Sequence, residues 1–214
     1  MARCGQGFNR CPEPGCIPEV RRIHMRQLLV VIALAASSAA FADPPQLVAA
    51  ARQQTRSAVT YDGSYTRIGY PMGDVPRGRG VCTDVVIRAY RAIGIDLQVL
   101  VHEDMRENFG LYPHLWGLSQ PDANIDHRRV PNLQKFFERV DAKVRHAGSA
   151  PVYLAGDLVT WMLPGNLPHI GIVSDRRAPE TSRPLIIHNI GAGPVEEDML
   201  FAYPITGHFR YRVR

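Results

Sequence analysis

The sequence lacks the cysteines that a disulfide framework would need. It has four cysteines in 214 residues, and three of them, Cys4, Cys11 and Cys16, precede a segment with the features of an export signal. If that segment is removed, Cys82 is the only thiol left, which excludes an internal disulfide. A lone thiol in an oxidising compartment is either buried or used, so Cys82 is a candidate nucleophile.

The sequence also lacks an apolar run long enough to anchor it in a bilayer. The apolar stretch 28–39 is shorter than the roughly 20 residues that a spanning helix needs. A basic start at Met25, this stretch and the small-residue site that ends at Ala42 together predict a secretory signal peptide. We therefore expect a leader at 1–42 with its true start at Met25, and a periplasmic or secreted protein whose single domain covers 43–214.

A strong positive charge is missing once the leader is set aside. The formal net charge is +5, but the leader carries five arginines and two glutamates, which leaves 20 basic and 18 acidic residues, a net charge of +2. No basic stripe interleaved with aromatic residues replaces the lost charge. We therefore expect no nucleic-acid partner and no stable membrane span, and the sequence makes no prediction of oligomeric state.

The domain does contain a helical pattern that starts at Cys82. Apolar residues recur at three- and four-residue steps from Val81 to Ile93, and Gly94 is placed as a helix stop. In the first turn of a helix, free backbone N–H groups and the helix dipole favour an anion, which lowers the pKa of a thiol. Asp84 is rotated away from the thiol and is expected to cap the helix or pair with a cation. The alternative is that Cys82 is an inert buried residue.

The elements fall into two groups, helices first and strands second. This order predicts an α+β fold with an antiparallel sheet. A glycine-rich loop at 61–80 leads to Cys82, and the charged loop at 126–129 is expected to be exposed. Besides the Cys82 helix, the patterns predict helices at 46–58, 96–105 and 132–146 and strands at 156–162, 170–173, 184–187 and 208–213.

Two histidines stand where a thiol nucleophile would need them. His169 opens one predicted strand and His188 ends the next, so they approach on one face if these strands pair, with Asn189 on the opposite face. An imidazole can take the thiol proton and hand it to the leaving group, and a second polar group can fix its tautomer. The same pair is compatible with a structural role. It is also compatible with a metal site that includes His127, although zinc prefers three or four closely spaced ligands.

The motifs follow one another in a specific order. Cys82 at a helix start precedes a Gly-Asp-Leu run at 156–161, a His-x-Gly-Ile run at 169–173 and an apolar run that ends at His188. This order resembles the NlpC-type cell-wall endopeptidases of the papain-like cysteine peptidase superfamily. The resemblance implies an α+β, papain-like NlpC-type fold in which the nucleophile, at a helix start, packs on an antiparallel sheet.

The resemblance also implies roles for individual residues. Cys82 would be the nucleophile, His169 the general base and His188 its orienting partner. Tyr70 matches, by its spacing upstream of Cys82, a tyrosine that lines the oxyanion site in that family, and Asn189 is a further candidate there.

Three longer motifs resemble a bacterial family of unknown function that is numbered 1287. Asp84, in the first of them, departs from the endopeptidase pattern, in which the second position after the cysteine is small. A carboxylate near the thiol raises its pKa, which affects the rate of the reaction rather than its type. The motifs lie at 79–84, 121–132 and 188–194.

We therefore expect an exported cysteine peptidase or amidase with a Cys82-His169-His188 mechanism. By resemblance, its substrate is a peptide bond in the peptidoglycan stem, and it requires no metal and no cofactor. Within the enzyme class, a thiol acyltransferase or a thioesterase could use the same residues. Outside it, the alternatives are a non-catalytic binding module on the same fold and a metal-binding role for His127, His169 and His188.

Overall fold

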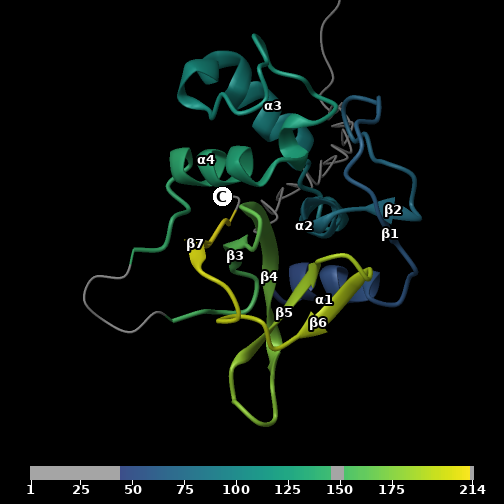
Figure 1. Cartoon of the computed structure of the whole chain (residues 1–214), viewed down its shortest axis with the longest axis vertical. Helices are drawn as coiled ribbons and strands as arrows, with labels where there is room; N and C mark the ends of the chain where they lie inside the picture. Colours follow the sequence, from purple (N-terminus) through teal and green to yellow (C-terminus); the bar gives the residue numbers. More distant parts are fainter. Residues whose placement is uncertain (1–43, 146–151, 213–214) are drawn as a thin grey trace, which may run out of the picture. The chain divides into compact units, whose positions relative to one another are not determined.

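Four α-helices and a five-stranded antiparallel sheet form the described part of the chain, so the predicted α+β class is confirmed (Figure 1). The computed structural model describes residues 44–145 and 152–212. The predicted leader at 1–42, with its start at Met25 and its cleavage after Ala42, lies outside them. None of the helices within these ranges is long and apolar enough to cross a membrane. The single domain at 43–214 stays a prediction.

The helix that begins at Cys82 forms as the apolar spacing predicts. It ends at Ala92, and Gly94 follows with a φ of 83°, a left-handed conformation that glycine adopts without strain. The next helix is capped by Asp96, whose side chain accepts a hydrogen bond from the Gln98 amide at 3.0 Å. The helices are α1 (Pro44–Gln54), α2 (Cys82–Ala92), α3 (Leu97–Asn108) and α4 (Val130–Arg139), with short 3-10 turns η1 (Phe109–Leu111) and η2 (Asp126–Arg128).

The predicted boundaries of the last helix are wrong at both ends. It begins at Val130 rather than at Asn132, because Pro131 fits the first turn, where its missing N–H is not needed. It ends at Arg139, since Asp141 has a φ of 55° and turns the chain out of the helix. The chain then runs beside the last strand, where the Val144 amide donates to the His208 carbonyl at 2.8 Å.

The sheet has the strand order β6-β5-β4-β3-β7, and every neighbouring pair is antiparallel. Figure 1 shows the β4–β5 hairpin reaching away from α3 and α4. The sequence patterns missed β6 and underestimated the length of β4. The strands are β3 (Leu158–Leu163), β4 (Leu167–Arg177), β5 (Pro184–Asn189), β6 (Pro194–Glu197) and β7 (Ile205–Phe209), and a separate parallel pair joins β1 (Thr60–Tyr61) to β2 (Arg79–Gly80).

Alternating residues of the strands build a core on each face of the sheet. One face, with Ile170 and Ile172, packs with apolar residues of the helices in the larger cluster. The other face, with Trp161 and Val173, is covered by Met199 and Leu200. Trp161 is fully buried, and its indole N–H donates to the Leu200 carbonyl at 2.9 Å, so it is a core residue.

Candidate active site

Cys82 lies in the first turn of α2, against the segment of β4 that carries His169. The residue is 4% exposed, and its thiol is hydrogen-bonded by the backbone amide of Ile170, the residue that follows His169. Burial raises the pKa of the thiol to about 11, and the Asp84 carboxylate adds to this effect, while backbone N–H groups at the helix start oppose it. The expected lowering of the thiol pKa by the helix start is therefore wrong for the resting protein, because desolvation outweighs the helix dipole.

Asp84 fixes the start of the helix, as the sequence predicts. Its carboxylate accepts the Val81 N–H at 2.7 Å and receives the Arg128 guanidinium at 2.8 and 3.0 Å, all within the protein interior. The preceding Gly80 is needed for close approach, since a Cβ there would lie 3.1 Å from Asp84 and 3.2 Å from the Arg88 guanidinium. These contacts hold Cys82 in one place.

The charged loop at 126–129 is not exposed, contrary to expectation. Asp126, His127 and Arg128 are all buried in η2, and the Thr83 hydroxyl donates to the Arg128 carbonyl at 3.0 Å. Burial lowers the pKa of His127 to about 3, helped by Arg128 and Arg91, and raises that of Asp126 to about 6. The loop therefore supports the start of α2 from within the protein.

The structure brings His169 and His188 together and adds a third group, Glu197. The Nε2 atom of His169 lies 3.0 Å from Nδ1 of His188, and Nε2 of His188 lies 2.9 Å from the Glu197 carboxylate. Glu197 reaches His188 because Val195, two residues before it on β6, is the direct partner of His188 in the register. Both histidines are fully buried, whereas the Glu197 side chain is 53% exposed.

The contacts of Glu197 assign the proton positions along this series. An ionised carboxylate only accepts hydrogen bonds, so Nε2 of His188 carries a proton and its Nδ1 accepts one from Nε2 of His169. Burial and the neighbouring His188 lower the pKa of His169 to about 3, so its ring is neutral at pH 7. Nδ1 of His169 is then an unprotonated nitrogen with no hydrogen-bond partner among the described residues. That atom has the properties of a general base.

Gly171 explains the His-x-Gly spacing. A Cβ at this position would lie 2.6 Å from the Ile186 side chain and 3.1 Å from Cβ of His188. Contacts of that length are shorter than packed side chains tolerate. The absence of a side chain therefore allows β4 and β5 to approach closely at the point where the two imidazoles meet.

The two weaker candidates lie in different places. The Tyr70 ring packs edge-on against His102 on α3, at a centroid distance of 5.3 Å, and it is Tyr61 whose hydroxyl interacts electrostatically with Cys82. Burial raises the pKa of Tyr61 to about 12, so it remains a hydrogen-bond donor at pH 7. The Asn189 side chain is buried and donates to the Gly80 carbonyl at 3.4 Å, which connects the end of β5 to the loop before Cys82.

The structure does not bring His127, His169 and His188 together as a metal site would require. His127 lies beside Arg128 and Arg91, two cations that disfavour a bound metal ion. Within 44–145 and 152–212, no three His, Cys, Asp or Glu side chains are arranged to hold one.

Two comparisons with known proteins bear on this arrangement. The family model described as Domain of unknown function (DUF1287) matches residues 48–211. "Uncharacterized protein YijF" of Escherichia coli (strain K12) is 56% identical over 165 residues, which is 77% of this chain and 80% of the relative. The family match spans Cys82, His169, His188 and Glu197.

Proposed function

The chain belongs to the family described as Domain of unknown function (DUF1287), and from that premise we propose that it is an NlpC-type cysteine hydrolase that cleaves an amide bond. The observation that carries the proposal is the hydrogen-bonded series from His169 through His188 to Glu197. Its free nitrogen belongs to the residue next to Ile170, whose backbone amide contacts the thiol. Among the described residues no hydrogen bond joins His169 to Cys82, so the proposed proton transfer requires the two side chains to approach when substrate binds. A papain-like fold, with the thiol at a helix start against the sheet, is part of this proposal.

The reaction proceeds through a thioester. Nδ1 of His169 takes the Cys82 proton as the sulfur bonds to the carbonyl carbon, and the proton then passes to the leaving amine as the C–N bond breaks. Water attacks the thioester with His169 again as the base, which releases the carboxylic acid and restores the thiol. Backbone N–H groups at the start of α2 and the Tyr61 hydroxyl stabilise the oxyanion.

The resting state contains a neutral thiol and a neutral imidazole. Between the pKa of His169, about 3, and that of Cys82, about 11, neither group is charged. Proton transfer therefore accompanies attack instead of preceding it, which distinguishes this site from one with a preformed thiolate. His188 and Glu197 stabilise the imidazolium that forms, since a carboxylate at 2.9 Å from His188 favours positive charge on the pair.

The proposed substrate is a peptide in the peptidoglycan stem, and the proposed location is the periplasm or the exterior. Support for the location comes from the signal-like leader, and support for the substrate comes from the NlpC resemblance. A thioesterase or acyltransferase would use the same thioester and would differ in the donor or acceptor group.

The test is hydrolysis of purified muropeptides, with products identified by mass spectrometry. We expect cleavage by the wild-type chain and none by Cys82→Ser. Thr83→Ser is the matched control because it changes the adjacent residue and keeps the hydroxyl that donates to the Arg128 carbonyl. Equal cleavage by wild type and Cys82→Ser would contradict the mechanism.

One observation favours a second candidate, a non-catalytic binding module. Cys82 is almost fully buried, and burial raises the pKa of its thiol, which disfavours the thiolate at pH 7. A module of this kind would bind the same peptides without cleaving them. Binding that persists unchanged in Cys82→Ser, with no cleavage by the wild type, would identify it.

A further inference from the structure

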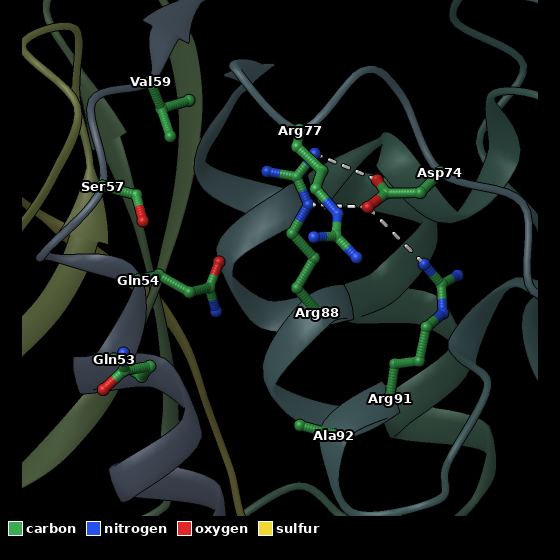
Figure 2. A pocket seen from close by; sticks show the side chains of 9 residues that line it. All are labelled: Gln53, Gln54, Ser57, Val59, Asp74, Arg77, Arg88, Arg91 and Ala92. Carbon is green, nitrogen blue, oxygen red and sulfur yellow. Dashed lines mark hydrogen bonds and ion pairs between the residues drawn. The ribbon is translucent and has the colours of Figure 1, made fainter.

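A pocket lies at the other end of the helix that carries Cys82. It has a volume of about 490 Å³ and opens between α1, the loop around Asp74 and the last turns of α2 (Figure 2). Arg88 and Arg91 are six and nine residues beyond Cys82, which places them about 9 to 14 Å along the helix axis from the thiol. The pocket is lined by Gln53, Gln54, Ser57, Val59, Asp74, Arg77, Arg88, Arg91 and Ala92.

Three guanidinium groups face a single carboxylate in this pocket. Asp74 receives Arg88 at 2.9 and 3.1 Å and lies 3.9 Å from Arg91. Arg91 also lies 3.5 Å from Asp96, which is outside the lining. Arg77 has neither a hydrogen bond nor an ion pair within the described ranges. In Figure 2 the Arg77 side chain lies between those of Arg88 and Arg91. The pocket therefore carries an excess of positive charge even when Asp96 is counted.

The remaining lining groups are neutral and polar or small and apolar. Gln54 is held in place, because its amide donates to the Val85 carbonyl at 2.9 Å. Ser57 and Gln53 add further hydrogen-bonding groups, and Val59 and Ala92 add apolar surface. A volume of this size falls within the range of about 300 to 1,000 Å³ that is usual for small-molecule sites.

We propose that this pocket binds a small oxyanion, a carboxylate or a phosphate group, with Arg77 as its principal contact. A guanidinium matches the paired oxygens of both groups with two parallel N–H donors. Arg77 is available for this role because none of its donors is used by the residues that the structure describes. Arg88 and Arg91 supply the surrounding positive charge, while Asp74 keeps them in position. The site is separate from the proposed active site and does not depend on Cys82.

The test is calorimetric titration of the purified full chain at constant ionic strength. The carboxylate probe is N-acetyl-glutamate, the phosphate probe is inorganic phosphate, and chloride serves as the reference anion. We expect at least one of the two oxyanions to bind in competition with chloride. The separate titrations with N-acetyl-glutamate and phosphate show whether a carboxylate or a phosphate group is preferred. Arg77→Gln should weaken that binding roughly tenfold or more, since a charge-assisted hydrogen bond is lost.

The controls separate this site from general surface charge and from the proposed catalysis. Arg67→Gln removes an exposed arginine outside the pocket and should leave the affinity unchanged. Cys82→Ala should also bind normally, so a failure of the hydrolase proposal leaves this result intact. Absence of binding by both probes at millimolar concentration, or equal affinities of Arg77→Gln and wild type, would overturn the proposal.

Discussion

Two groups of imidazole and carboxylate side chains lie at the same sheet. They differ in whether an imidazole nitrogen is left without a hydrogen bond. At β3 and β7, the buried Asp157 accepts hydrogen bonds from His208 at 2.7 Å, from Arg210 at 2.7 and 2.8 Å and from the Leu154 amide at 2.8 Å. At β4, β5 and β6, His169, His188 and Glu197 form a linear series.

The group around Asp157 is structural, and we call it the anchor. The group that ends at His169 can accept a proton. Burial acts to raise the pKa of Asp157, but hydrogen bonds from Arg210 and His208 outweigh it and hold that pKa below its usual range. The carboxylate is thus a permanent anion with every contact structural. The series at His169 ends instead in an unprotonated nitrogen without a hydrogen-bond partner among the described residues, and its carboxylate is half exposed. An imidazole can act as a base only where such a nitrogen is left free.

The largest expected effect is on catalysis at the series with the free nitrogen. His169→Ala should lower kcat/KM on the muropeptide by about 10²- to 10⁴-fold, the usual contribution of a positioned general base. The measurement is steady-state hydrolysis beside a thermal unfolding curve, which shows that the variant is folded. A folded His169→Ala protein with wild-type activity would show that the His169 series is no more catalytic than the group around Asp157.

The anchor should respond in the opposite way. Asp157→Ala leaves the buried His208 and the partly buried Arg210 without their carboxylate, and we expect the free energy of unfolding to fall by about 3 kcal/mol, the lower end of the range for broken buried pairs. Urea denaturation measures it. Activity per folded molecule should stay unchanged, and a selective loss of kcat in a stable variant would show that Asp157 is catalytic instead.

Glu197 should matter to catalysis and little to stability. Glu197→Gln keeps an acceptor for His188 but removes the charge that stabilises the imidazolium, so we expect kcat to fall roughly tenfold, since the charge-assisted part of such a bond contributes about 1.5 kcal/mol. The denaturation midpoint should stay close to wild type because the side chain is half exposed. Glu180→Gln, at another exposed position, is the control. A kcat equal to that of wild type would exclude Glu197 from the series.

The smallest expected effect is on the pH dependence of stability. The folded-state pKa of His169, about 3, lies below the unfolded value of about 6.5. The unfolded chain therefore binds more protons between these values, and the free energy of unfolding falls as the pH falls through that window. His127 acts in the same direction, while Asp126, with its pKa raised to about 6, acts against them. Urea midpoints at pH 7 and pH 4 should differ less in His169→Gln than in wild type.

Much of the fold could be predicted from the sequence, because periodicity carries local information. The start of α2 at Cys82 and the cap at Asp96 follow from apolar spacing and side-chain chemistry. The short strand β6 could not be found this way, since four residues after two glycines have too little periodicity. Because β6 was missed, Glu197 was not recognised as a partner of His188. The adjacent acidic pair Glu196-Glu197, close in sequence to the apolar run that ends at His188, was a signal that could have indicated it.

The candidate site was predictable in its residue types but not in its environment. His169 and His188 were expected to meet if their strands paired, and the register brings them together. Burial depends on the whole fold, so neither the raised pKa of Cys82 nor the interior position of Arg128 could be derived from local sequence. The same limit applies to Tyr70, since spacing alone could not show that the Tyr61 hydroxyl interacts electrostatically with the thiol.

The central claim is that Cys82 reacts through His169, and acylation by 4-nitrophenyl acetate tests it without knowledge of the natural substrate. Peptide mapping by mass spectrometry locates the acyl group, so the cysteines of the leader do not confuse the result. We expect a stoichiometric burst of nitrophenol with the acyl group on Cys82, and a burst rate at least about 100-fold lower in His169→Ala. Acylation of Cys82 at the same rate in wild type and His169→Ala, or an acyl group on another residue, would contradict the claim.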